Sequence, residues 1–128
     1  MVAPRKRVLI VDDEISVAQM LRKRLEMAHF EVLVALDGME GLEKARREPP
    51  DIIILDCMLP RMNGFEVCTL LKQDHRYEHI PVLMLTARAT AADRQDGLKC
   101  GADVYVTKPY QAEELLRHIQ TLLSRIPS

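Results

Sequence analysis

Short runs of apolar residues alternate along this chain with longer segments in which apolar residues recur every three or four positions. The short runs are rich in β-branched residues, as expected for buried parallel strands, whereas the longer spacing is typical of helices that cover one face of a sheet. The expected strands are residues 7–11, 31–35, 51–55, 81–85 and 104–107, and the expected helices are residues 15–28, 39–47, 64–72, 91–99 and 112–123.

Each expected strand is followed by an expected helix, so the chain contains five strand–helix units. Right-handed crossover connections leave few other arrangements, and this order therefore predicts an α/β fold. We expect a doubly wound, five-stranded parallel sheet with helices on both faces. A length of 128 residues fits one such domain, so residues 1–128 are expected to form a single domain.

The overall composition excludes several classes of function. A formal net charge of -1 provides no broad field for nucleic acid or anionic lipid, so we expect neither direct nucleic-acid binding nor membrane attachment. No apolar run approaches the roughly 20 residues that span a bilayer. The three cysteines are widely spaced and form no C-x-x-C motif, which argues against a disulfide framework or structural zinc and favours the cytoplasm.

Charged residues of complementary sign end three of the five apolar runs. Asp12 and Asp13 follow the first run, Asp56 follows the third, and Lys108 follows the fifth. Ligands of open α/β sheets bind beyond the carboxyl ends of the strands, so three carboxylates and one ammonium are expected at one edge. Thr86 ends the fourth run and adds a hydroxyl donor.

Three clustered carboxylates require a cation among them, since two like charges roughly 4 Å apart repel by about 4 kcal/mol at an effective dielectric constant near 20. An all-oxygen ligand set suits Mg²⁺ bound together with a phosphate. A metal, the Lys108 ammonium and the Thr86 hydroxyl around one carboxylate suit phosphoryl transfer to that carboxylate. Asp56 is the expected acceptor, and Asp12 and Asp13 are the expected metal ligands.

Several short motifs follow one another along the chain. They are Val-Asp-Asp-Glu at 11–14, Leu-Asp at 55–56 followed by Met58-Leu59-Pro60 and Asn63-Gly64, Leu85-Thr86-Ala87, Gly101-Ala102-Asp103, and Thr107-Lys108-Pro109. Together they resemble the receiver domain of two-component response regulators, over essentially the whole chain. Agreement of several ordered motifs is far more specific than one Asp-Asp pair. The resemblance implies a flavodoxin-like, or CheY-like, (βα)5 fold with strand order 2-1-3-4-5.

The resemblance also implies a role for each candidate residue. Asp56 would accept a phosphoryl group from a sensor histidine kinase or a phosphotransfer protein, and Lys108 would contact that group. A Mg²⁺ cofactor would be bound by Asp13, Asp56 and the backbone carbonyl of Cys57, with Asp12 acting through water. Such a protein is a signalling phosphoacceptor that assists only its own phosphorylation and dephosphorylation, and not an enzyme with an independent substrate.

The same resemblance implies a conformational switch. The Thr86 hydroxyl would move toward the phosphoryl group and Tyr105 would turn inward, which would change the surface formed by the fourth helix, fifth strand and fifth helix. That surface would alter binding of a downstream protein or self-association. We expect the Lys108–Pro109 peptide to be cis. No output domain is expected within these 128 residues, so the chain would be a stand-alone receiver or part of a longer regulator.

The residue two positions after Asp56 bears on how long a phosphoryl group would last. Met58 cannot orient an attacking water, and Arg88, two residues past Thr86, is bulky. We therefore expect moderate or slow autodephosphorylation.

Two other functions share part of the pattern. A Mg²⁺-dependent phosphohydrolase of the haloacid dehalogenase type also uses a nucleophilic Asp with Thr and Lys, but it requires a second acid where this chain has Met58. A flavodoxin-like nucleotide or flavin binder requires a phosphate loop where Asp12-Asp13-Glu14 would repel phosphate in the absence of a metal. At single positions, Asp13 could instead cap the following helix and Tyr105 could be a core aromatic residue.

Overall fold

The computed structural model describes residues 5–86 and 100–124, in which five strands and four helices are present. The helix expected at 91–99 lies outside the described residues, and so does Arg88. The strands are β1 (Arg7–Val11), β2 (Glu31–Ala35), β3 (Ile52–Asp56), β4 (Val82–Thr86) and β5 (Val104–Thr107); the helices are α1 (Ile15–Met27), α2 (Gly38–Arg47), α3 (Gly64–Lys72) and α5 (Ala112–Ser124).

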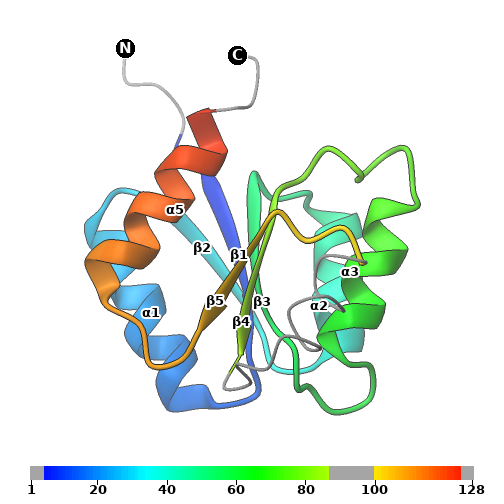
Figure 1. The fold of residues 1–128 in the computed structure, drawn as a ribbon, viewed down its shortest axis with the longest axis horizontal. Helices are drawn as coiled ribbons and strands as arrows, with labels where there is room; N and C mark the ends of the chain where they lie inside the picture. The colour runs from blue at the N-terminus through cyan, green and yellow to red at the C-terminus, as the bar shows by residue number, and fades with distance from the viewer. Residues whose placement is uncertain (1–4, 87–99, 125–128) are drawn as a thin grey trace.

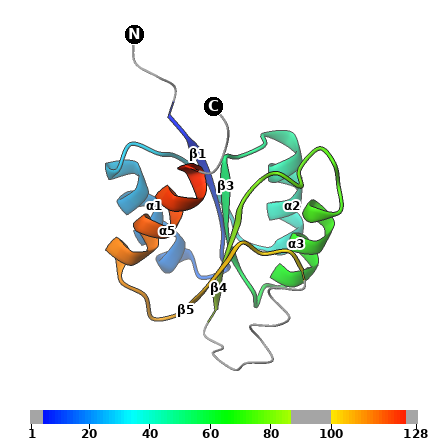
Figure 2. The same ribbon diagram turned by 45° about the horizontal axis from the view of Figure 1, so that its top comes forward.

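The five strands form one sheet in the order β2-β1-β3-β4-β5, and every neighbouring pair is parallel. Helices α1 and α5 lie against one face, and α2 and α3 lie against the other (Figure 1). The turned view separates the same two helical layers (Figure 2). The predicted doubly wound architecture and strand order are therefore confirmed.

The strand sequences explain why both faces are covered. Successive side chains of a strand point to opposite faces, and β1 and β3 are apolar at nearly every position. Leu9 and Ile53 are 0% exposed and belong to the core cluster beneath α2 and α3, whereas Ile10 and Ile54 belong to the cluster beneath α1 and α5. Full burial of each such side chain stabilises the fold by about 1.5–3 kcal/mol.

Side chains that accept backbone N–H groups begin two of the helices. Asp37 accepts from the Glu40 N–H at 2.8 Å before α2, and Asn63 accepts from the Glu66 N–H at 3.0 Å before α3. The N-cap of α1 is Glu14, whose side chain makes no capping bond. The alternative reading of Asp13 as a helix cap is therefore wrong, and this carboxylate is left exposed at the end of the sheet.

Strands β3 and β4 each begin and end one residue later than predicted. β3 begins at Ile52 because the Asp51 carboxylate accepts the Arg7 N–H at 2.7 Å, which holds Asp51 in the preceding turn. β4 begins after Pro81, which lacks an N–H to donate to the ladder. Helix α3 has the predicted bounds, and α1, α2 and α5 each differ by one residue at one end, as frayed termini commonly do. Among the described residues, no helix has both the length and the apolar character that crossing a membrane requires.

Candidate functional site

Three carboxylates meet at the carboxyl ends of the two central strands. Asp12 directly follows β1, and Asp56 is the last residue of β3. These strands are paired with Val11 opposite Leu55, so the register places Asp12 beside Asp56. Asp13 joins them, and carboxylate oxygens of the three residues all lie within 4.8 Å of one another. The predicted gathering of these side chains is observed.

Two of these carboxylates are buried. Asp12 is 2% exposed and Asp56 is 6% exposed, whereas Asp13 faces solvent. Burial raises the pKa of Asp56 above the ordinary aspartate value of 3.8, because a charged carboxylate is poorly stabilised away from water. The Met58 N–H bond to Asp56 Oδ1, at 3.1 Å, and the Lys108 charge oppose this rise in pKa.

Lys108 brings one positive charge to the cluster from the end of β5. Its Nζ lies 3.2 Å from Asp12 Oδ2 and 3.3 Å from Asp56 Oδ2. Burial disfavours the charged form, yet the adjacent carboxylates of Asp56 and Asp12 raise the pKa of Lys108 overall. The Lys108–Pro109 peptide is cis, as expected from the sequence. One ammonium thus bridges two buried carboxylates.

The charges of this site do not balance. Among residues 5–86 and 100–124, these three carboxylates face one ammonium, that of Lys108, which forms ion pairs with Asp12 and Asp56. Oxygen donors in this number suit a hard divalent cation such as Mg²⁺. The Cys57 carbonyl, next to Asp56, accepts the Gly64 N–H at 2.9 Å, and a carbonyl oxygen has a second lone pair for a metal. The residues present therefore fit a magnesium ion.

The loop between β3 and α3 encloses the site closely. A Cβ atom on Gly64 would overlap the backbone carbonyl of Asp56, so only glycine allows this approach. Met58 is 54% exposed beside Asp56, and a recess of about 440 Å³ opens between Asp13 and this loop. In the sequence, Asn63-Gly64 is recognisable only as part of a motif. The Asn-Gly pair at the start of an expected helix is the one feature of the sequence that could have indicated this close packing.

The two expected switch residues occupy neighbouring strands. Thr86 is the last residue of β4 and pairs in register with Thr107, which directly precedes Lys108. Tyr105 is opposite Met84 and is half-buried against the core cluster beneath α2 and α3. The backbone therefore brings Thr86 to the same end of the sheet as the carboxylates. Tyr105 lies two residues before the end of β5.

A second feature near Lys108 escaped the sequence reasoning. A mostly apolar recess of about 490 Å³ lies between α1 and the β5–α5 connection, with Met20 on one side and Pro109 and Tyr110 on the other. Burial raises the pKa of the Tyr110 hydroxyl. The sequence carried no signal for this recess, because its walls come from segments far apart along the chain.

Comparison with known proteins identifies the family. Residues 8–120 match the model of the response regulator receiver domain. The chain is 44% identical over 119 residues to the DNA-binding dual master transcriptional regulator RpaA of Synechocystis, covering 93% of this chain and 49% of that protein. It is 43% identical over 120 residues to the alkaline phosphatase synthesis transcriptional regulatory protein PhoP of Bacillus subtilis, covering 94% and 49%. The chain thus spans about half the length of these relatives.

Solved structures agree with this match. A response regulator receiver domain from Methanospirillum hungatei has a TM-score of 0.89 at 30% identity and covers 94% of this chain and 95% of its own. The receiver domain of a sensor histidine kinase from Pseudomonas aeruginosa, with a magnesium ion coordinated in its active-site cleft, has a TM-score of 0.87 at 27% identity, covering 94% and 98%. The chain therefore belongs to the family of response regulator receiver domains.

Proposed function

We propose that this domain is a phosphorylation-controlled switch in which Asp56 is the phosphoacceptor. The observation that carries the proposal is the unbalanced cluster, with three carboxylates within 4.8 Å of one another and Lys108 bound to two of them. A carboxylate oxygen of Asp56 attacks the phosphorus of a donor, and the bond from phosphorus to the donor's leaving group breaks. The donor would be a sensor histidine kinase or a phosphotransfer protein.

Each neighbouring group has a separate task in this proposal. Asp13, Asp56 and the Cys57 carbonyl would bind Mg²⁺, with Asp12 acting through water. The metal, when bound, would neutralise charge on the transferring phosphoryl oxygens. Lys108 already lies 3.3 Å from Asp56 Oδ2, so its ammonium can pair with a phosphoryl oxygen after a small rearrangement.

The phosphoryl group would then alter a distant surface. Thr86 stands at the end of β4, one strand from Asp56 and one register position from Lys108. We assign its hydroxyl to the phosphoryl group and Tyr105 to the following movement within β5. The surface that includes β5 and α5 would change its affinity for a partner by population shift. Self-association is one possible outcome of that change.

The relatives suggest what kind of output the switch would control. The Synechocystis relative is a DNA-binding regulator about twice the length of this chain. We propose that residues 8–120 act as the receiver domain and that the output is either a fused domain or a separate protein, with no direct DNA contact by the receiver. The phosphohydrolase alternative has no support, because Met58 stands where that class requires an acid.

Incubation with acetyl phosphate and Mg²⁺, followed by intact mass spectrometry, tests this function. The wild-type protein should gain one phosphoryl group, and Asp56→Asn should gain none. Glu43→Gln, which removes the same charge from an exposed position of α2, should label like the wild type. Labelling of Asp56→Asn at the wild-type level would refute the acceptor assignment, and sustained release of inorganic phosphate without a labelled protein would indicate a phosphatase.

A further inference from the structure

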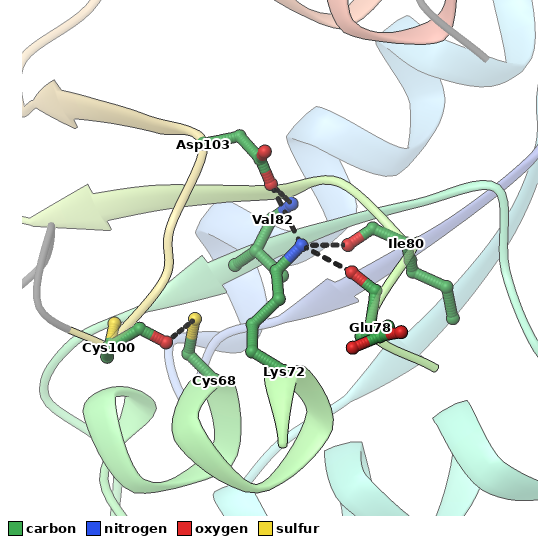
Figure 3. A network of polar contacts seen from close by, with 7 residues as sticks. All are labelled: Cys68, Lys72, Glu78, Ile80, Val82, Cys100 and Asp103. Carbon is green, nitrogen blue, oxygen red and sulfur yellow. Dashed lines mark hydrogen bonds and ion pairs between the residues drawn. The ribbon is translucent and has the colours of Figure 1, made fainter. Parts of the chain in front are cut away.

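Two of the three cysteines lie together although 31 residues separate them in the sequence. Cys68 is in the middle of α3, and Cys100 precedes the residues that lead into β5. The Cys68 thiol donates to the Cys100 carbonyl at a sulfur–oxygen distance of 3.3 Å (Figure 3). The third cysteine, Cys57, directly follows β3 and is the residue after Asp56.

A second contact holds the same two segments together. Lys72, one helical turn after Cys68, forms an ion pair with Asp103 at 3.1 Å (Figure 3). Between them, a Cβ atom placed on Gly101 would lie 2.9 Å from Lys72 Cγ, so the backbone at this point touches α3 directly. The residues from 100 to 103 are thus fastened to α3 at both ends. The meeting of the two cysteines is part of this packing.

The two thiols differ in access and acidity. Cys100 is 7% exposed, whereas Cys68 and Cys57 are 0% exposed. Apart from the bond to the Cys100 carbonyl, side-chain hydrogen bonding between the two thiols lowers the pKa of the Cys100 thiol to about 7; burial opposes this fall, and nearby Lys72 supports it. The bond with Cys100 and burial raise the pKa of Cys68. Cys100 is therefore the more acidic thiol of the pair and the better nucleophile, and Cys68 is the thiol that keeps its proton.

We propose that Cys68 and Cys100 form a peroxide-sensitive dithiol that closes into an intramolecular disulfide. The Cys100 sulfur attacks one oxygen of a hydroperoxide, an S–O bond forms, the O–O bond breaks, and the leaving oxygen is protonated to water or an alcohol. The Cys68 sulfur then attacks the Cys100 sulfenic acid, an S–S bond forms, the S–O bond breaks, and water leaves with the Cys68 proton. The two thiols are oxidised by two electrons, and the hydroperoxide is reduced.

The bond has a defined structural consequence. It would link α3 covalently to the entrance of β5, where Lys72 and Asp103 already pair. Cross-linking residues 68 and 100 removes conformational freedom mainly from the unfolded chain, so the oxidised protein should have a higher Tm. The site does not involve Asp56, and the inference holds whether or not that residue is phosphorylated.

Treatment with hydrogen peroxide, followed by intact mass and non-reducing peptide mapping, tests the proposal. The wild-type protein should lose two hydrogen atoms, yield a Cys68–Cys100 peptide pair, and show a Tm several degrees higher that dithiothreitol reverses. Cys57→Ala, the matched control, should form the same pair. Cys68→Ser should stop at a Cys100 sulfenic acid that dimedone traps, and Cys100→Ser should resist the same peroxide dose.

Several results would overturn it. A dimedone adduct that persists in the wild-type protein would show that Cys68 does not resolve the sulfenic acid. Pairing through Cys57, disulfides only between molecules, or an unchanged mass would show that the observed contact is not a reactive one. A lower Tm after oxidation would show that the bond needs a distorted fold. The wild-type peptide map decides the matter even where a serine variant does not fold.

Discussion

Two lysine–aspartate clusters lie at opposite ends of the same sheet and differ in their charge balance. At the amino ends, the Lys72 ammonium contacts one carboxylate, that of Asp103 at 3.1 Å, and the carbonyls of Glu78 and Ile80 at 3.1 and 2.7 Å (Figure 3). The Asp103 carboxylate also accepts the Val82 N–H at 2.8 Å. The ammonium and the carboxylate of this cluster are thus each satisfied by hydrogen bonds and by their mutual ion pair.

At the carboxyl ends, Lys108 is shared between Asp12 and Asp56, and Asp13 adds a third negative charge. The surplus carboxylates repel one another and two of them are buried, which costs stability. This contrast distinguishes a cluster that joins elements of the fold from one that is suited to bind a ligand. A balanced cluster joins elements of the fold. An unbalanced cluster is held together by the surrounding core, and binding of a cation would stabilise it further.

Exchange of each lysine for methionine should separate the two clusters most strongly. Lys108→Met removes a charge aimed at the reacting group, so phosphorylation by acetyl phosphate should fall by about 100-fold. Lys72→Met keeps the aliphatic stem but removes the ammonium that bonds to two carbonyls and to Asp103, which keeps the Val82 N–H; this loss should lower the free energy of unfolding by about 1–3 kcal/mol. Intact mass and urea denaturation measure the two effects.

The two variants should not share a phenotype. Lys72→Met should label at the wild-type rate under conditions in which it is folded, and exposed Lys23→Met on α1 should change neither property. If Lys72→Met lost labelling as severely as Lys108→Met, the distinction between a structural and a functional cluster would fail.

Magnesium should stabilise the folded protein through the carboxylate cluster at the carboxyl ends of the strands, and not through the Lys72–Asp103 cluster. At about 100 times its dissociation constant, Mg²⁺ should raise the free energy of unfolding by about 2.7 kcal/mol, because it binds the folded cluster and not the unfolded chain. Asp13→Asn should abolish most of this gain, whereas Glu43→Gln and Asp103→Asn should preserve it. Denaturation with Mg²⁺ or with a chelator measures the gain. An equal gain in Asp13→Asn would place the ion elsewhere.

The sequence predicted the cluster around Lys108 better than the cluster around Lys72. Asp12, Asp56 and Lys108 each follow an apolar run, and parallel strands bring such positions to one edge whatever the details of packing. Lys72 offered no comparable signal. Two of its partners are backbone carbonyls, which every residue possesses, and its third partner is Asp103, 31 positions away.

The pairing of two cysteines and the N-cap of α1 were likewise not predictable from the sequence. Spacing alone gave no reason to join Cys68 to Cys100, since only the packing of α3 against the residues before β5 brings them together. Asp13 resembled a helix cap, but the Asp12 carboxylate accepts the Glu14 N–H at 2.9 Å and α1 begins one residue later. Local propensity therefore identified the elements, and tertiary contacts decided which side chains meet.

Replacement of Asp56 or of Asp103 by asparagine should change the free energy of unfolding in opposite directions when a chelator is present. Because burial raises the pKa of Asp56 above 3.8, the folded protein binds this proton more tightly than the unfolded chain does. The contribution of Asp56 to stability is thus most favourable below pH 3.8 and falls as the pH rises through the raised folded value. Asp56→Asn should stabilise the protein at pH 7.

That gain should disappear as the pH falls below 3.8, because the wild-type carboxyl is then neutral in both states. Asp103→Asn should instead destabilise the protein at pH 7 by about 1 kcal/mol, through loss of its bonds to Lys72 and Val82. Urea denaturation at several pH values measures both. A loss of stability in Asp56→Asn at neutral pH would mean that its pairing with Lys108 outweighs the cost of burial.

The smallest effect should come from the side chain that borders the site without belonging to the cluster. Met58 is 54% exposed, its backbone N–H bonds to Asp56 Oδ1 at 3.1 Å, and its side chain cannot hold a water for attack on a phosphoryl group. Met58→Asn should therefore speed loss of the phosphoryl group several-fold, as followed by intact mass after removal of acetyl phosphate. Leu70→Asn, at an exposed position of α3, should leave the decay unchanged. Equal rates of phosphoryl loss in Met58→Asn and the wild type would show that residue 58 does not control the access of water to Asp56. The charged groups around Asp56 would then be the remaining determinants of the phosphoryl lifetime.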